Sequence, residues 1–224
     1  MGSVRGGTGL DGLFLLLHLL VFVYWLGGDL GAFYASRLLA DSRRGPTARA
    51  AAANILMTVD MAPRMGLIFA FPTGFALAIS RGWLAVDPIW IAPAFAFATL
   101  WAVAAWLVHL KSGPYALAGW FDTGVRWLAM GALVAVGLRG DWDLPLFIAL
   151  KLLLLAFAIA CGLMIRRALK PFGPAFAKLS AGQESDEVNI VIAGTLADAK
   201  RYVIAIWAAL LGAAALGVWT PASF

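Results

Sequence analysis

Two ionisable side chains interrupt long apolar segments of this sequence, where hydrocarbon would surround them. His18 lies within LFLLLHLLVF, and Lys151 lies within FIALKLLLL. An ionisable group inside a membrane is costly, so such a residue is a functional candidate by default. Each lies about six residues inside the same end of its segment, which predicts that the imidazole and the amine share one depth.

His18 offers one nitrogen ligand in apolar surroundings. Histidines in helical bundles commonly hold haem iron, and a haem b would give this imidazole a partner; a hydrogen bond to another span is the alternative. Trp25 and Asp29 follow at i+7 and i+11, on the same helix face, and we expect Trp25 to contact the cofactor. His109 lies at the opposite end of its segment, so we expect it to be solvated at the membrane surface. The second iron ligand would then be Lys151, a methionine or none.

A second polar group lies at another depth. Asp60 and Arg64 are four residues apart, a spacing that predicts an ion pair along one helix, and Asp29 could join them from the first helix. This network either fixes the packing of the helices or passes protons. Gly27, Gly28 and Gly31 form a small-residue surface that would let a neighbouring helix or a flat ligand approach the backbone.

A stripe of methionines accompanies this group. Met57, Met61 and Met65 recur at four-residue spacing in the second apolar segment. Thioethers bind copper(I), but a methionine stripe is also ordinary packing material. The single cysteine, Cys161, is expected to be a packing residue.

Composition shows what must position these residues. The chain is 62% hydrophobic and 13% charged, against about 25% charged residues in soluble domains. The sequence therefore predicts an all-α integral membrane bundle of about six transmembrane helices, forming a single domain over residues 1–224 without a water-soluble part. The expected spans are 12–37, 52–80, 88–110, 117–138, 144–165 and 199–219.

The basic residues predict the orientation of the bundle. One side collects twelve of them, namely Arg37, Arg43, Arg44, Arg49, Lys111, Arg126, Arg166, Arg167, Lys170, Lys178, Lys200 and Arg201; the other side collects Arg5, Arg81 and Arg139. The positive-inside rule then places both termini outside. The predicted location is the inner (cytoplasmic) membrane of a bacterium, with the lipid bilayer and a membrane protein or a second copy as partners, and no nucleic acid. Residues 182–198 are expected to form a separate helix on the inner surface.

The first segment also resembles a known family. It carries the series Leu17-His18-Leu19-Leu20, Tyr24-Trp25-Leu26-Gly27-Gly28, Phe33-Tyr34 and Arg37-Leu38. This series resembles the first helix of HemJ-type protoporphyrinogen oxidases and related CopD-like membrane proteins, and Leu150-Lys151-Leu152-Leu153-Leu154 is similar to their later helix with its lysine. The resemblance implies that His18 ligates haem and that Lys151 is needed for activity.

The leading hypothesis is therefore a haem-binding inner-membrane oxidoreductase with His18 as the metal ligand and Lys151 as the catalytic residue. Two alternatives stay open: a non-catalytic anchor or assembly subunit of a larger complex, and a transporter of copper or another small solute. The sequence contains no HExxH motif, Cys-x-x-Cys pair or glycine-rich phosphate loop, which argues against zinc hydrolase, thiol redox and nucleotide chemistry.

Overall fold

The structure, a computed structural model, describes residues 9–139 and 144–219. Six helical segments within these ranges are long and apolar enough to cross a membrane: Gly9–Ala40, Pro46–Ser80, Pro88–Leu110, Tyr115–Leu138, Leu146–Ala168 and Asp186–Val218. The described residues contain no strand. The predicted all-α membrane bundle of six spans is therefore confirmed. Arg5, which entered the count of basic residues, lies outside the described residues.

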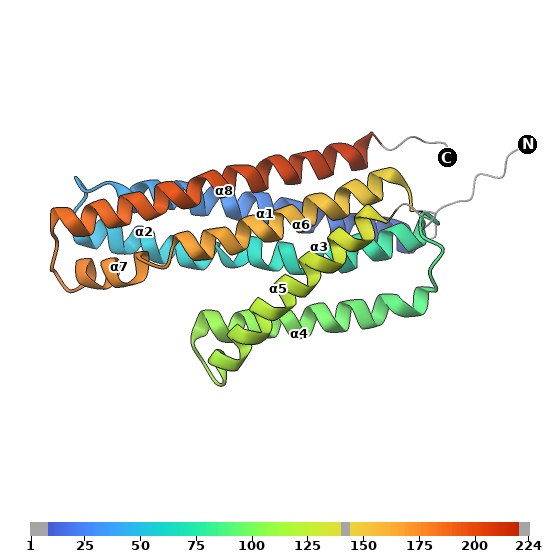
Figure 1. Ribbon diagram of the computed structural model, residues 1–224, viewed down its shortest axis with the longest axis horizontal. Helices are drawn as coiled ribbons and strands as arrows, with labels where there is room; N and C mark the ends of the chain where they lie inside the picture. The colour runs from blue at the N-terminus through green and yellow to red at the C-terminus, as the bar shows by residue number, and fades with distance from the viewer. Residues whose placement is uncertain (1–8, 140–143, 220–224) are drawn as a thin grey trace, which may run out of the picture.

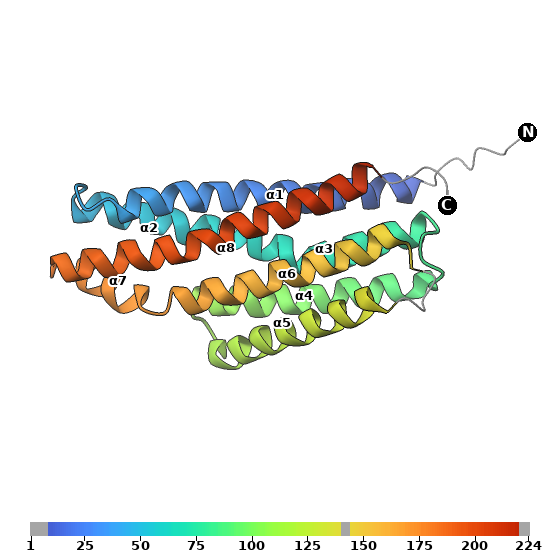
Figure 2. The ribbon, with the colours of Figure 1, turned by 45° about the horizontal axis from the view of Figure 1, so that its top comes forward.

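The helices form an elongated bundle, and the start of the first helix lies at the same end of it as the finish of the last helix (Figure 1). Helix α1 (Gly9–Ala40) packs on α3 (Met61–Ser80), and α6 (Leu146–Ala168) packs on α8 (Asp186–Val218). Helix α4 (Ile91–Leu110) follows the short helix η1 (Pro88–Trp90). Helix α5 (Tyr115–Leu138) then crosses obliquely from α4 to α6 (Figure 1), and in the turned view these three helices lie on the side of the bundle away from α1 (Figure 2). The bundle thus brings α1, α3, α6 and α8 together along its length.

The second predicted span is two helices in series. Helix α2 (Pro46–Val59) ends at Asp60, and α3 starts at the next residue. Pro63 explains this interruption, because its ring cannot donate a backbone hydrogen bond to Val59 and clashes with that residue's carbonyl. Pro72 lies further along, inside α3.

The last span begins earlier than the sequence predicted. Helix α8 is continuous over 33 residues, so residues 182–198 do not form a separate surface helix. Lys200 and Arg201 suggested a boundary there, but residues 186–219 contain no proline that would break the helix. The Ser185 hydroxyl caps the start of this helix by accepting the Val188 amide at 3.3 Å. An unpredicted short helix, α7 (Phe172–Ser180), precedes it.

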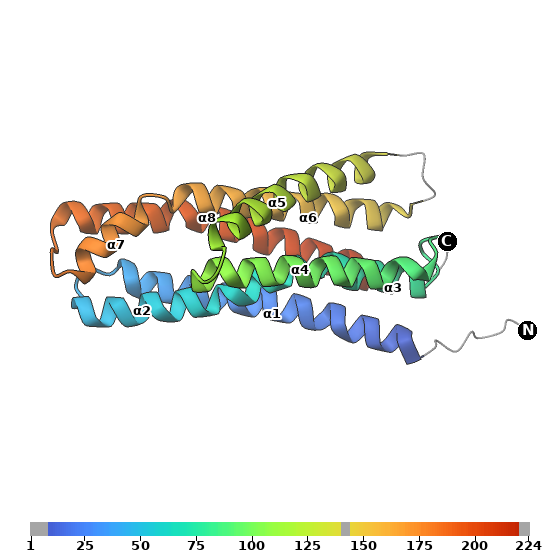
Figure 3. The same ribbon diagram turned by 90° about the horizontal axis from the view of Figure 1, so that it is seen from below.

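Four helices extend past the others at the end opposite the termini. Helix α1 has 32 residues, about 48 Å at 1.5 Å per residue, whereas the hydrocarbon core is about 30 Å thick. The loop between α4 and α5 stops well short of this end (Figure 3). We call this extension the inner lobe: the end of α1, α2, α7 and the start of α8. It has its own apolar core, formed by Leu39, Ala52, Ala53, Ala175, Leu179, Val188 and Ile192.

Two of the three glycines that the sequence suggested for a close helix contact do let a neighbouring helix approach α1: Gly28 faces α3, and Gly31 faces the end of α2. A methyl group on Gly28 would lie 2.5 Å from Pro63 Cδ, and one on Gly31 would lie 3.0 Å from Val59 Cγ1. A methyl group on Gly27 would meet nothing within 4 Å. Gly66 of α3 likewise allows α1 to pack closely, because a methyl group at this position would lie 2.6 Å from Trp25 Cβ.

This contact makes a matched pair of substitutions informative. Gly28→Ala should lower the free energy of unfolding by about 1–3 kcal/mol, because the helices must move apart to admit the methyl group. Gly27→Ala should leave it unchanged or raise it slightly, because alanine favours a helix over glycine. Thermal unfolding of both variants in the same detergent checks this. Equal stabilities for the two variants would show that the close packing of α1 on α3 is wrong.

Candidate functional site

The His18 side chain turns toward α3. Its Nδ1 lies 2.9 Å from Thr73 Oγ1, and a methyl group on Gly74 would lie 3.0 Å from the ring carbon Cε1. The single threonine hydroxyl proton is directed to the carbonyl of Phe69 at 2.7 Å. Thr73 therefore accepts a hydrogen bond from Nδ1–H of His18. This arrangement fixes the tautomer of the ring and leaves the lone pair on Nε2.

Lys151 reaches the same region from α6. Its charge is the one that acts on the His18 imidazole, although 133 residues of sequence separate the two side chains. A methyl group on Gly217 would lie 2.7 Å from Lys151 Nζ, so the amine lies against the backbone of α8 near its end. Both side chains are partly buried. The structure thus brings the imidazole and the amine to one level of the bundle.

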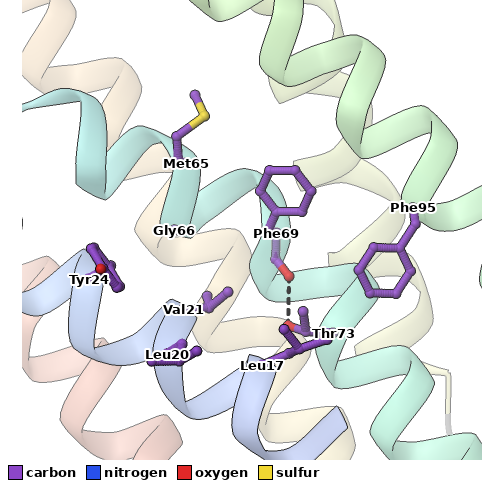
Figure 4. A pocket seen from close by; sticks show the side chains of 9 residues that line it. All are labelled: Leu17, Leu20, Val21, Tyr24, Met65, Gly66, Phe69, Thr73 and Phe95. Carbon is purple, nitrogen blue, oxygen red and sulfur yellow. Dashed lines mark hydrogen bonds between the residues drawn. The ribbon is translucent and has the colours of Figure 1, made fainter. Parts of the chain in front are cut away.

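An apolar groove lies beside Thr73, the partner of His18. Its volume is about 330 Å³, and it is formed by α1, α3 and α4 (Figure 4). Leu20 and Tyr24 are exposed at its edge, where acyl chains of a bilayer would reach them. Thr73 lines the groove and also holds His18, so it connects the two features. The lining residues are Leu17, Leu20, Val21, Tyr24, Met65, Gly66, Phe69, Thr73 and Phe95.

Trp25 and the three methionines of the predicted stripe differ in burial and in their distance from the groove. Trp25 is buried in the core between α1 and α3 and is not among the groove residues. Met57 is exposed, Met61 is buried, and Met65 lines the groove, so the three thioethers face different surroundings. Among the described residues, no group of three or more His, Cys, Asp or Glu could hold a metal ion. Any metal held by His18 would therefore depend mainly on one protein ligand or on a cofactor.

Asp60 and Arg64 pair as their spacing predicted. The Arg64 Nε and Nη2 atoms lie 2.7 Å and 2.5 Å from Asp60 Oδ2. Asp29 lies near Asp60 and Trp25, and its Oδ2 is buried without a hydrogen-bond partner in the described part of the chain. No ion pair joins Asp29 to Arg64 among the residues that the structure places. The two carboxylates are therefore neighbours, and only one of them holds the arginine.

A larger buried charge cluster was missed at the sequence level. Asp122 of α5 accepts Trp101 Nε1 at 2.7 Å and Arg126 Nε at 3.1 Å on one oxygen, and Arg166 Nη2 at 2.5 Å on the other. Asp122 and Arg126 are both nearly fully buried. The Arg126 guanidinium also lies 5.6 Å from the centre of the Trp101 ring. This cluster ties α4, α5 and α6 together inside the bundle.

The prediction that Arg126 is a topology signal near the membrane surface is wrong. Arg126 lies halfway along α5, and its side chain is only 4% exposed. The signal was available, because Asp122 and Arg126 show the same four-residue spacing as Asp60 and Arg64 inside an apolar span. Arg49 was counted among the basic residues of one side of the membrane, and the structure adds that its side chain is fully buried in the inner lobe.

His109 lies at the far end of α4 from the His18 level. It is partly buried, and its ring packs edge-on against Trp106 at 5.6 Å. His18 and His109 therefore do not meet at one site, as the depth argument predicted. Since the chain has only two histidines, His109 serves as a natural control for His18.

No family model matches the chain, and neither the curated proteins nor the solved structures contain a match to it. The likeness of the first helix to HemJ-type oxidases therefore stays a prediction. The arrangement of His18, Thr73 and Lys151 is the firmest guide to the chemistry that the bundle can perform.

Proposed function

We propose that the protein is a haem-binding oxidoreductase of the bacterial inner membrane, with His18 as an axial ligand to the iron. One observation carries the proposal: His18 Nδ1 lies 2.9 Å from Thr73 Oγ1, whose own proton is directed to the Phe69 carbonyl. The Nδ1–H therefore donates to Thr73, and the ring keeps a lone pair on Nε2. Histidines that ligate metals almost always donate their other ring N–H to a fixed acceptor, which sets the tautomer and orients the ring. Thr73 supplies such an acceptor from a different helix.

The surroundings of His18 fit a haem-type macrocycle in their chemistry. The groove beside Thr73 is apolar on nearly all of its lining, which suits a flat hydrophobic group entering from the bilayer. The Lys151 amine, at the same level, would hold a propionate or a substrate carboxylate, or donate a proton. A bound haem supplies one-electron transfer, which this chain's own side chains do not provide.

The proposal predicts a visible spectrum that depends on one histidine. Protein purified in mild detergent and titrated with haemin should develop a Soret band in the wild type. His18→Ala should abolish the band, because it removes the imidazole at that level and the second histidine, His109, lies at the other end of α4. His109→Ala should leave the band unchanged. Thr73→Val, which keeps the shape but removes the acceptor, should weaken haem affinity about 10–100-fold.

Each result is decisive for one part of the proposal. Loss of the band in His109→Ala, or its full retention in His18→Ala, would contradict the ligand assignment. A wild type that stays colourless after haemin titration while remaining folded would contradict haem binding itself. Lys151→Met separates binding from activity, because it should keep the band and lower electron transfer to an added quinone.

A further inference from the structure

The Asp122 cluster carries more positive than negative charge. The guanidinium groups of Arg126 and Arg166 share one carboxylate, that of Asp122. Arg64 is a further positive charge close to Arg126, and its own ion-pair partner is Asp60. Asp29 interacts with Asp60 and Trp25, and it forms no ion pair with Arg126 or Arg166 among the described residues. An uncompensated charge in a bundle interior is unfavourable unless an anion joins it.

One atom of the cluster is positioned to receive that anion. The Nη2 of Arg126 is buried and has no hydrogen-bond partner among the residues that the structure describes, and the residue is 3% exposed. The Nε of the same guanidinium group already donates to Asp122 at 3.1 Å, so the carboxylate holds the guanidinium plane in one orientation. A buried N–H of a charged group that finds no acceptor costs free energy, which an incoming oxygen would recover.

Arg166, at the edge of the Asp122 cluster, is accessible from the side of the membrane on which most basic residues lie. Arg166 lies two residues before the end of α6, about 3 Å along the helix axis, and its side chain is 35% exposed. Arg166 thus lies at the end of its apolar span, while Arg126 lies halfway along α5. Basic sites between transmembrane helices on the cytoplasmic side suit the phosphate groups of anionic lipids.

We propose that Arg126 and Arg166 form a binding site for a phosphate group, with Asp122 as the residue that orients both guanidinium groups. The phosphate belongs either to an anionic lipid of the inner leaflet or to a free anion from the aqueous side. The site is separate from the His18 level and does not depend on haem.

Thermal unfolding in detergent with added ligands tests the site. Phosphatidylglycerol, zwitterionic phosphatidylcholine and inorganic phosphate are compared at one ionic strength. Phosphatidylglycerol should raise the unfolding temperature of the wild type well above the value with phosphatidylcholine. Arg126→Lys keeps the charge but removes the unpartnered N–H, and should weaken phosphatidylglycerol binding about tenfold, the loss of one hydrogen bond to a charged group.

Two further variants keep the test interpretable if Arg126→Lys folds poorly. Arg166→Gln, at the exposed edge, should also lose the stabilisation, whereas Arg167→Gln should retain it, because Arg167 is exposed at the same helix end and carries the same charge. A full shift with inorganic phosphate alone would support the site and identify a free anion as its ligand. Equal shifts with both lipids and none with inorganic phosphate, or equal losses in the Arg166 and Arg167 variants, would overturn the proposal.

Discussion

Asp122→Asn should be among the most destabilising substitutions in the membrane part of the bundle. Asparagine can still accept a hydrogen bond from Trp101, but the substitution removes the carboxylate that pairs with both Arg126 and Arg166. Breaking a buried pair by neutralising one partner costs about 3–5 kcal/mol, because the other charge stays buried and uncompensated. Unfolding in a denaturing detergent, followed by circular dichroism, should therefore shift strongly.

The neighbouring ion pair provides the control for this prediction. Asp60→Asn removes a carboxylate of the same kind, but Asp60 and Arg64 are about one-third exposed and form a single pair, so the loss should be well below that of Asp122→Asn. The double variant Asp122→Leu with Arg126→Met should recover much of the stability, because it removes both buried charges and leaves Arg166 able to reach water. Wild-type stability in Asp122→Asn would contradict the structural role of the cluster.

The polar residues of the bundle form two separate levels. His18 and Lys151 lie toward the end where the chain starts and finishes, and Asp29 follows His18 by eleven residues along α1, about 16 Å. Asp29, Asp60 and Arg64 therefore belong to the half that also contains Arg126. A redox centre at the His18 level would be spatially separate from a phosphate site at the Arg126 level. A negative result in the haem titration would therefore leave the phosphate site unaffected, and the reverse also holds.

Apolar segment length and composition were sufficient to predict the spans. Six apolar segments, each long enough to span the hydrocarbon core, are too many to be buried in one water-soluble core, so they are expected to cross a bilayer. Local spacing also predicted the Asp60–Arg64 pair, since residues four apart meet on any helix. The same rule would have found Asp122 and Arg126, but Arg126 was counted as an orientation signal although it lies well inside the predicted span 117–138.

Contacts between distant segments were beyond the reach of spacing rules. The partner of His18 is Thr73, and which residue of α3 faces the imidazole depends on how far α1 slides along it. That register is set by the close approach at Gly28 and Gly66, not by any local pattern. The burial of Arg49 depends likewise on Glu184, 135 residues away, and on α8 extending past the bilayer.

The stability of the inner lobe should depend strongly on Arg49. Its side chain is fully buried, and it donates from Nε to the Leu39 carbonyl at 2.9 Å and from Nη1 to Glu184 at 2.9 Å and Asn189 at 2.7 Å. These bonds join the end of α1, α2 and the segment that starts α8. Arg49→Met keeps most of the volume but leaves a buried carbonyl and a carboxylate without their donor, a cost of about 3 kcal/mol.

The effect should be confined to the lobe, because the lobe has a core separate from the membrane core. Amide hydrogen exchange in α2 and α7 should accelerate about 100-fold in Arg49→Met, while exchange in α4 to α6 stays at the wild-type rate. Arg43→Met is the matched control: Arg43 is exposed and bonds Asp41 at 2.9 Å, which lowers the pKa of that carboxyl from its ordinary value, and its loss should leave exchange unchanged. Uniform acceleration across all helices in Arg49→Met would mean that the lobe and the membrane bundle unfold as one unit, because a local defect would then be transmitted through α1 and α8.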